Sequence, residues 1–497
     1  MTSALSARST EILAALTRLR EADAPTHGGH VLSYVYDSGR AELDELAAEA
    51  IRLMQPVNGL DPTTFPSVAA MERDLVRFTR RMLHGDQEVV GTVTSGGTES
   101  CLLAVKTARD AWRSAGGSGT PRLLAPVTVH AAFSKAAHYF GLELDLVPVD
   151  MSGVLEAARL TERSGPDVAL VVVSAPAYPH ASLDPVADVA AAAAAAGIAC
   201  HVDACIGGFV LPWWAAEDGG PLPAWDFAVD GVTSMSADLH KFGYAPKGAS
   251  VLLHRGRDRQ RGQYFATRRW PGYPVVNATV LGSKSAGALA AAWAIVERLG
   301  EDGFAGLAAS CQRSTDAVTA TVRTIEGLRV VGSPVGPLLA VATDDAAPED
   351  RRVDPHHWAD AVREHGWLLQ LQPGLVQADG TRLPHTTHLT ITPVSESVLP
   401  DLLLALTSAA DEVRGVPAAS AGSIVPSEIG DVLTGLGNRA DPLTSEEASA
   451  LLAGLGIGAG GSVLPERMAP LLAVLETLPA PLTERLLVEL LAGLVDP

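Results

Sequence analysis

The feature that most constrains the fold is a regular alternation of short apolar runs with helical runs, beginning near residue 89. This alternation is typical of β-α-β units, in which parallel strands are covered by helices on both faces. It predicts the α/β class, with one large and mostly parallel sheet. The sequence predicts helices at 98–112 and 185–197, and strands at 88–94, 142–149, 167–174, 198–205 and 231–236.

The remaining sequence divides the chain into four expected parts. A long helical run at 282–300 leaves the large domain, and shorter strand and helix signals follow it to about residue 415. Thr444 and Glu447 form a capping-box signal before a short helix. The expected parts are an N-terminal helical segment (1–60), a large domain (61–300), a small α+β domain (301–415) and a C-terminal extension with a linker and short helices (416–497).

Bulk composition excludes several function classes. The 497 residues carry a formal net charge of −20, which argues against binding to nucleic acid or anionic membranes. No apolar run is long enough to span a bilayer, and charges interrupt the first 25 residues, so these predict an amphipathic helix and no secretory signal. No CxxC pair occurs, and a reducing cytoplasm is the expected location for the four cysteines, Cys101, Cys200, Cys205 and Cys311.

A glycine-containing turn joins a predicted strand to a predicted helix in "TVTSGGTES" (92–100). Gly96 and Gly97 allow the backbone to approach an anion closely, and the helix that follows offers free N–H groups. The hydroxyls of Ser95 and Thr98 add further donors. The stretch therefore predicts a phosphate cradle, although a plain strand-to-helix turn explains it equally well when it is taken alone.

The stretch "HVDAC" places His201, Asp203 and Cys205 on one face of a strand. These residue types could ligate a metal, but one strand rarely supplies three ligands to one ion, and we predict no metal site. Asp203 lies at the carboxyl end of its strand, where open α/β sheets bind ligands. It is either a buried carboxylate bonded to backbone or the partner that keeps a cationic ring nitrogen protonated.

Two further residues complete the pattern. His130 follows a strand end, where it could cap a helix or stack on a planar ligand. Lys241, in "SMSADLHKFGYAPKG" (234–248), follows a buried strand although burial of an ammonium is costly. Desolvation and nearby positive charge would lower its pKa and let the neutral amine form a Schiff base. A phosphate cradle, a ring-nitrogen partner, a stacking imidazole and this lysine together predict pyridoxal 5'-phosphate as cofactor.

The chain resembles the fold-type I pyridoxal-phosphate enzymes of the group II decarboxylase superfamily, and within it the sphingosine-1-phosphate lyases. The similarity covers roughly residues 25–415, and "HVDAC" with "HKFGYAPKG" is its most specific part. Other matching stretches are "NGLDPTTFPSVAAME", "TSGGTES", "HAAFSKAAHYFG", "PHASLDPV", "QYF" and "GSKSAG".

The resemblance implies a seven-stranded sheet in the large domain and a role for each matched residue. Lys241 would carry the cofactor, Asp203 would pair with its ring nitrogen, and His130 would stack on its ring. Lys247 would lie near the substrate, and Tyr34 would be an active-site tyrosine, although Tyr36 is only two residues away. The other implied cofactor contacts are Ser95, Gly96, Gly97, Thr98, Ser174, Cys205, Ser236 and His240.

The resemblance also implies a homodimer with shared active sites and a carbon–carbon lyase acting on a small amino substrate. Retro-aldol cleavage of a β-hydroxyamine is the first expectation, amino-acid decarboxylation the alternative, and transamination the third. Where the lyases read N-P-L-H, this chain reads Asn58-Gly59-Leu60-Asp61, and Lys284 replaces the arginine of their G-S-R-P-G motif. Asn58, Asp61 and Lys284 are thus expected at the substrate, and the replacements weigh against a sphingoid phosphate.

Overall fold

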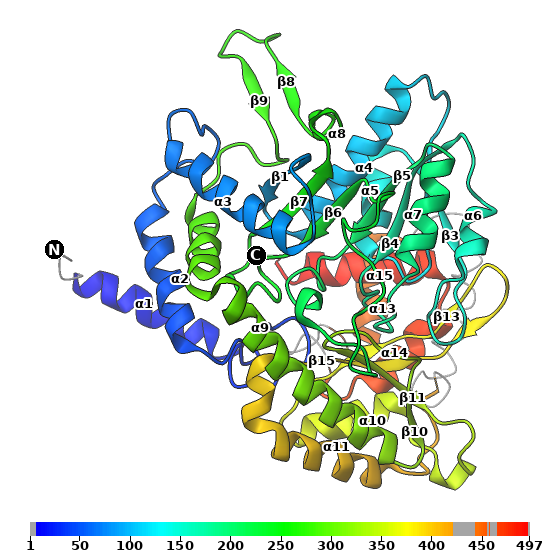
Figure 1. Cartoon of the computed structure of the whole chain (residues 1–497). Coiled ribbons are helices and arrows are strands. Elements are labelled where there is room, and N and C mark those ends of the chain that lie inside the picture. The colour runs from blue at the N-terminus through cyan, green and yellow to red at the C-terminus, as the bar shows by residue number, and fades with distance from the viewer. Residues whose placement is uncertain (1–5, 421–442, 455–456, 458–464, 496–497) are drawn as a thin grey trace.

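The computed structural model describes residues 6–420, 443–454, 457 and 465–495 (Figure 1). Its largest element is a seven-stranded sheet in the order β1-β7-β6-β5-β4-β2-β3. The neighbours from β6 to β3 pair in parallel, whereas β7 is antiparallel to both β1 and β6. The prediction of a mostly parallel seven-stranded sheet is therefore confirmed. The strands are β1 (Val89–Thr94), β2 (Arg122–Pro126), β3 (Glu143–Val147), β4 (Val168–Ser174), β5 (Ala199–Asp203), β6 (Ser234–Ala237) and β7 (Ser250–Arg255).

Helices surround this sheet, as Figure 1 shows. The interior strands are apolar on both faces, and every residue of β4 is buried, as expected where helices cover both sides. The covering and connecting helices are α2 (Ala41–Met54), α3 (Pro66–Met82), α4 (Gly97–Ser114), α5 (Ala131–Phe140), α6 (Ala157–Thr161), α7 (Val186–Ala195), α8 (Arg257–Arg261) and a short 3-10 turn at Leu211–Trp213.

The register of the parallel strands aligns their carboxyl ends. Ser174 at the end of β4 pairs with Asp203 at the end of β5, and Asp203 pairs with Ser236 in β6. Three residues that are distant in sequence thus lie side by side at one edge of the sheet. In open α/β sheets this edge is where ligands bind.

A smaller antiparallel sheet has the order β10-β11-β15-β12 and a separate core around the buried Trp358. Helix α9 (Gly287–Thr324) connects it to the large sheet and is interrupted at Gly300, which has φ 55°. The expected boundary between the large and small domains falls at this residue. The other elements are β10 (Leu328–Val330), β11 (Leu338–Thr343), α10 (Pro355–Glu364), β12 (Gln370–Gln372), β15 (Thr386–Thr390), α11 (Leu399–Val413) and 3-10 turns at Glu349–Arg351 and Pro393–Val398.

The expected N-terminal helix is present as α1 (Ala7–Arg20), but it buries none of its residues. Its apolar residues Ile12, Leu13, Leu16 and Leu19 are all exposed, and the helix protrudes from the body in Figure 1. Two hairpins project elsewhere: β8 (Phe265–Thr267) with β9 (Val275–Asn277), and β13 (Leu375–Val376) with β14 (Arg382–Leu383).

The C-terminal extension contains α13 (Ser445–Gly454), α14 (Ala469–Thr477) and α15 (Ala480–Gly493), which share a small apolar core. The predicted capping box is confirmed, because Thr444 Oγ1 accepts from Glu447 N at 3.2 Å and Glu447 Oε2 accepts from Thr444 N at 2.9 Å. Most of the expected linker, residues 421–442, lies outside the described residues. None of the helices in the described part of the chain is long and apolar enough to cross a lipid bilayer.

Candidate active site

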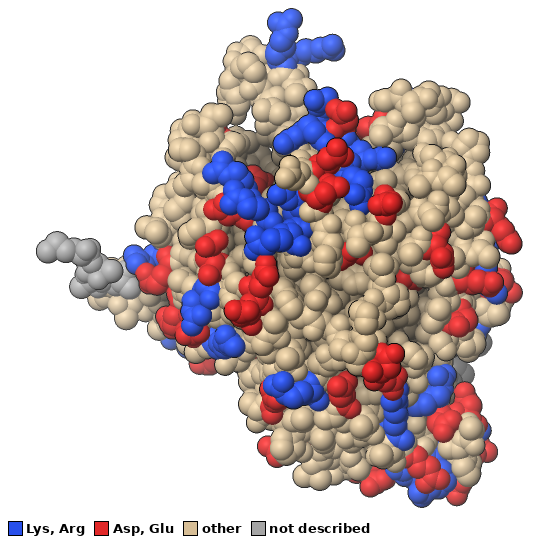
Figure 2. Space-filling view, viewed as in Figure 1, with Lys and Arg blue, Asp and Glu red and all other residues tan. Residues whose placement is uncertain are grey.

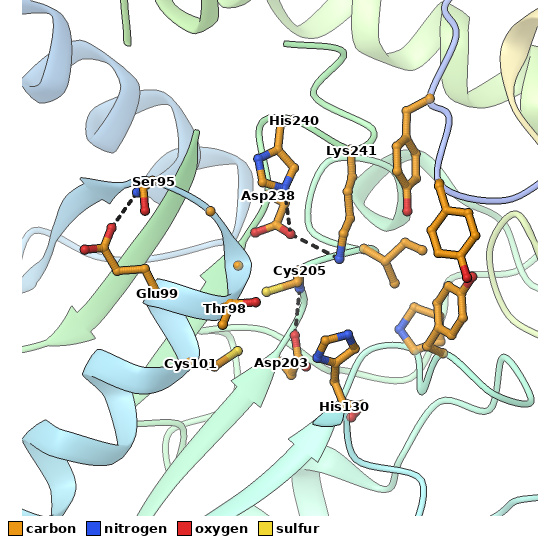
Figure 3. A pocket seen from close by; sticks show the side chains of 18 of the residues that line it. Ser95, Thr98, Glu99, Cys101, His130, Asp203, Cys205, Asp238, His240 and Lys241 are labelled. Atoms are coloured by element: carbon orange, nitrogen blue, oxygen red, sulfur yellow. Dashed lines mark hydrogen bonds and ion pairs between the residues drawn. The ribbon is translucent and has the colours of Figure 1, made fainter. Parts of the chain in front are cut away.

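A cavity of about 590 Å³ opens at the edge of the sheet where the parallel strands end. It receives residues from the loop before α2, the start of α4, the ends of β4 and β5, and the segment after β6 (Figure 3). The lining residues are Tyr34, Tyr36, Ser95, Gly96, Gly97, Thr98, Glu99, Cys101, His130, Ser174, Pro176, Tyr178, Asp203, Cys205, Ile206, Asp238, His240, Lys241 and Gln370.

The first turn of α4 forms one side of the floor of this cavity. Gly96 has φ 153°, and a Cβ on Gly97 would lie 2.5 Å from Asp238 Oδ2, so these positions have no room for a side chain. No side chain caps α4, which leaves its first N–H groups available to an anion. Glu99 holds the turn in place by accepting hydrogen bonds from Ser95 N at 2.6 Å and Val280 N at 2.6 Å.

Asp203 lies at the floor of the cavity, where its Oδ1 accepts a hydrogen bond from Cys205 N at 3.0 Å. His201 does not join it, because its ring contacts Ser234 Oγ at 2.8 Å and Ser236 Oγ at 3.2 Å. Ser236 is fully buried beneath the floor, where it also accepts a hydrogen bond from Cys205 Sγ at 3.2 Å. The structure therefore brings Asp203, Cys205 and Ser174 to the cavity but leaves Ser236 and His201 out of its lining.

Lys241 reaches the cavity next to an acidic residue that sequence reasoning did not single out. Asp238 is buried, with 1% of its side chain exposed, and its Oδ2 lies 3.1 Å from Lys241 Nζ and 3.5 Å from His240 Nε2. Asp238 stands three residues before Lys241 within the same quoted stretch, so the spacing alone could have drawn attention to it.

The expected lowering of the Lys241 pKa is wrong. Burial alone would lower the pKa, but the charge of Asp238, together with Tyr36, Cys205 and Asp203, outweighs burial and raises the pKa of Lys241 well above its ordinary value. Burial raises the pKa of Asp238, but the charge of Lys241 and the hydrogen bonds and charge of its other neighbours, His240 first among them, together keep the carboxyl pKa below its usual range. Without cofactor, Lys241 is therefore an ammonium ion paired with a carboxylate.

His130 stands at the N-terminus of α5 and faces the cavity. Its Nδ1 accepts a hydrogen bond from Ala132 N at 3.1 Å, so it caps the helix as well as lining the cavity. In the neutral ring this bond leaves the proton on Nε2. The capping role and the cavity-facing position, which the sequence offered as alternatives, are thus compatible.

The rim of the cavity contains a chain of hydrogen bonds that sequence reasoning missed. Gln370 Nε2 donates to Tyr34 Oη at 2.7 Å, and Tyr178 Oη donates to Gln370 Oε1 at 2.6 Å. Tyr34 has φ 59°, a conformation that non-glycine residues rarely adopt and that is common at functional sites. No local pattern could have found Gln370, which lies 336 residues from Tyr34 in sequence.

Lys247 lies beside the cavity and outside its lining. Its Nζ is 4.6 Å from the centre of the Tyr36 ring and donates to His240 O at 3.0 Å. Burial and the nearby charge of Lys241 lower the pKa of Lys247 to about 8. Of the two lysines in this stretch, Lys247 is therefore the one whose amine loses its proton near neutral pH.

None of the three expected substrate residues lines the cavity of its own chain. Lys284 N donates to Asn58 Oδ1 at 3.4 Å, and Lys284 Nζ donates to Thr279 Oγ1 at 2.8 Å. Lys284 lines a smaller cavity of about 220 Å³ that also contains Ser95. Asp61 is half-buried and caps its own turn by accepting hydrogen bonds from Thr63 and Thr64, which hold the pKa of its carboxyl below the usual value.

Comparison with known proteins decides the family. The model of the pyridoxal-dependent decarboxylase conserved domain matches residues 27–331, and the model of the C-terminal HTH domain of pyridoxal-dependent enzymes matches residues 427–493. The chain belongs to the pyridoxal-dependent decarboxylase family. The cofactor of the family is pyridoxal 5'-phosphate, which confirms the cofactor expected from the sequence.

The chain is similar to several lyases. The chain is 38% identical to the sphingosine-1-phosphate lyase of Dictyostelium discoideum over 71% of its own length, and it spans 63% of the length of that relative. The solved structure of the sphingosine-1-phosphate lyase of Burkholderia pseudomallei is 30% identical, with a TM-score of 0.74 over 89% of this chain and 97% of that one. The glutamate decarboxylase of Lactobacillus brevis shares the fold, with a TM-score of 0.71 over 83% of this chain and 94% of that one, at 20% identity.

The residues of the cavity fit this cofactor. The uncapped start of α4 and the two glycines suit its phosphate, and a carboxylate suits a pyridinium nitrogen. Lys241 supplies the primary amine that its aldehyde requires, and the amine lies in the same cavity as Asp203 (Figure 3).

Proposed function

We propose that this chain is a pyridoxal-phosphate-dependent carbon–carbon lyase that cleaves a small β-hydroxyamine by a retro-aldol reaction. The observation that carries the proposal is the position of Lys247, whose amine has a pKa lowered to about 8 and lies 4.6 Å from the ring of Tyr36, a residue that lines the cavity. Retro-aldol cleavage requires a base for the β-hydroxyl proton, whereas loss of carbon dioxide does not.

Each cofactor contact has a distinct task in this proposal. Gly96, Gly97 and Thr98 at the start of α4 hold the phosphate, and His240 lies beside them. His130 would stack on the ring, Asp203 would keep the ring nitrogen protonated, and Lys241 would supply the amine for the aldehyde. When bound, the cofactor withdraws electrons from the substrate α-carbon, so that a bond to this carbon can break.

The ion pair between Asp238 and Lys241 governs how the lysine amine becomes available. The amine must lose a proton before it can attack an aldehyde, and Asp238 opposes that loss. His240 Nε2 lies 3.5 Å from the same carboxylate. We therefore expect cofactor capture to become faster as pH rises.

Lys247 removes the proton from the substrate hydroxyl, because its neutral amine is a stronger base near neutral pH than a phenol. Burial raises the pKa of Tyr34, so this tyrosine remains protonated and donates or accepts hydrogen bonds without acting as the base. Gln370 fixes its hydroxyl by the 2.7 Å bond described above. Tyr34 thus orients the substrate.

Amino-acid decarboxylation is the second candidate, and transamination is the third. An α-carboxylate is usually held by an arginine. Among the described residues that line the cavity there is no arginine, which favours a substrate without that carboxylate. The polar group at the far end of the substrate is expected to differ from that of a sphingoid phosphate, because Asp61 adds negative charge and Lys284 lacks the bidentate fork of arginine.

We also propose that the protein is a homodimer in which Asn58, Asp61 and Lys284 serve the cavity of the partner. Their absence from the lining of the cavity of their own chain supports this arrangement. The four cysteines are free thiols, which supports a reducing cytoplasm as the location. On the face in Figure 2, acidic and basic side chains are interspersed, in keeping with a small-molecule substrate.

The test is product analysis. Purified protein with cofactor is incubated with a panel of β-hydroxyamines and α-amino acids, and aldehyde release and carbon dioxide release are measured separately. Aldehyde from β-hydroxyamines, with turnover that rises through pH 8, is the expected result. Release of carbon dioxide without aldehyde would contradict retro-aldol cleavage and support amino-acid decarboxylation.

A further inference from the structure

Two thiols and a carboxylate meet at the floor of the cavity. Cys101 comes from the second turn of α4, whereas Asp203 and Cys205 come from the end of β5 (Figure 3). Their two sulfur atoms and a carboxylate oxygen all lie within 4.8 Å of one another. All three residues are buried, with relative exposures of 1%, 7% and 7%.

This cluster differs from the arrangement considered from the sequence. His201 was the third candidate ligand on the strand, but its ring is bonded to Ser234 and Ser236. Cys101 takes its place, because Gly97 allows the start of α4 to approach the strand end so closely that a Cβ there would lie 2.9 Å from Cys205 Sγ. A second element therefore supplies the ligand that one strand could not.

We propose that, in the chain free of cofactor, Cys101, Cys205 and Asp203 bind a thiophilic divalent cation such as Zn²⁺ or Cd²⁺. Zinc bonds of about 2.3 Å to sulfur and about 2.1 Å to oxygen require tetrahedral ligand atoms to be roughly 3.5–3.8 Å apart, so the present ligands need to move by only about an ångström. Water from the cavity completes the coordination. Asp203 bonds Cys205 N through Oδ1, and its second oxygen is the one offered to the metal.

The cation must displace two protons. Hydrogen bonding with Cys101, burial and the charge of Asp203 raise the pKa of Cys205 well above its usual value. Hydrogen bonding with Cys205 lowers the pKa of Cys101, but burial and the nearby carboxylates outweigh it and leave that pKa raised. Both thiols are therefore protonated at neutral pH, and the affinity for metal rises with pH by up to about 100-fold per unit, the limit for release of two protons.

Metal and cofactor exclude one another, because Asp203 cannot hold both a cation and a pyridinium nitrogen. This exclusion, unlike the metal site itself, rests on the role proposed above for Asp203. The cluster would thus bind metal only in chains that have not yet received cofactor, and bound metal would slow the formation of the holoenzyme.

The test is a Cd²⁺ titration of the full-length chain after removal of cofactor. Binding is measured by the ultraviolet charge-transfer absorption of cadmium–thiolate bonds. One Cd²⁺ per chain is expected, with affinity reduced at least about 100-fold in Cys101→Ser and in Cys205→Ser. Cys200→Ser is the matched control, because Cys200 is buried in the same strand as Asp203 but lies outside the cluster. Circular dichroism verifies that each variant is folded.

The proposal is overturned if the full-length chain binds no Cd²⁺, or if Cys101→Ser and Cys200→Ser bind it equally well. A second measurement tests the mutual exclusion of metal and cofactor separately from the existence of the metal site. Pyridoxal 5'-phosphate is added to the cadmium-loaded chain, and its visible absorption is expected to appear at least about tenfold more slowly than without metal. Normal uptake with cadmium still bound would leave the metal site in place and contradict the proposed role of Asp203.

Discussion

The floor and the rim of the cavity are built in different ways. The floor consists of Gly96, Gly97, Asp203 and Asp238, which lie at strand ends or at the start of α4 and are fixed by the sheet and its helices. The rim consists of Tyr34 and Gln370, which come from a loop and from the small sheet, and Lys247 lies just behind it against Tyr36. On the proposed function, the floor sets the cofactor chemistry, whereas the rim selects the substrate and the bond that breaks.

The largest predicted effect is at the floor. Asp203→Ala removes the negative charge that keeps the ring nitrogen protonated, and turnover is expected to fall by about 1,000-fold while weak cofactor binding remains. Steady-state turnover and a cofactor titration followed by absorbance measure the two properties separately. Turnover near that of the unmodified protein would show that Asp203 is not the group that keeps the ring nitrogen protonated.

The next effect tests whether the rim contributes to the chemistry. Lys247→Met removes the proposed base, and turnover is expected to fall by about 100-fold, the lower end of what a general base contributes. The pKa of Lys247 is lowered to about 8, so the neutral, active amine accumulates as pH rises through 8, and turnover of the unmodified protein rises over the same range. This rise should disappear in the variant.

The matched control for this experiment is Lys106→Met. Lys106 pairs with Asp110 at 3.1 Å on α4 and is not among the residues that line the cavity. It should keep both the rate and the pH profile. A pH profile of turnover that still rises near pH 8 in Lys247→Met would show that another group acts as the base.

A smaller effect concerns the ion pair within the floor. Asp238→Asn removes the largest of the charges that raise the pKa of Lys241, so burial offsets more of the remaining effect and that pKa is expected to fall. In the unmodified chain the neutral amine is scarce and cofactor capture accelerates with pH throughout the neutral range. The variant should capture cofactor about tenfold faster at pH 7, for a pKa that is lower by at least one unit.

The rate of cofactor capture is measured from the visible absorbance after the chain is mixed with cofactor. Asp354→Asn is the control. Asp354 is a buried carboxylate that caps α10 in the small domain. An unchanged pH dependence in Asp238→Asn would show that the carboxylate does not set the protonation of Lys241.

The smallest effect is expected at the rim. Tyr34→Phe loses one hydrogen bond from Gln370, a contribution of about 1 kcal/mol, which corresponds to about a fivefold increase in KM. Cofactor affinity should not change, because Tyr34 lies away from the floor. A loss of cofactor binding in this variant would contradict the division between floor and rim.

The same division explains what could be predicted from the sequence. Asp203 and Lys241 follow recognisable strands, and Gly96 and Gly97 join a strand to a helix, so local patterns place all four at one edge of the sheet. The pairing of Tyr34 with Gln370 depends on contact between segments 336 residues apart, which no local pattern encodes.

Charge was harder to predict than position. The raised pKa of Lys241 depends on the 3.1 Å approach of Asp238, and that distance is a property of the folded segment. The thiol cluster likewise depends on how closely α4 approaches β5, because Cys101 and Cys205 are 104 positions apart in the chain.

The most direct test of the account is identification of the lysine that binds the cofactor. The holoenzyme is reduced with borohydride, digested, and analysed by peptide mass spectrometry. The label is expected on Lys241, the lysine whose amine opens into the cavity beside Asp203. A label on Lys247, only six residues away, would contradict the assignment of floor and rim on which the proposed function rests.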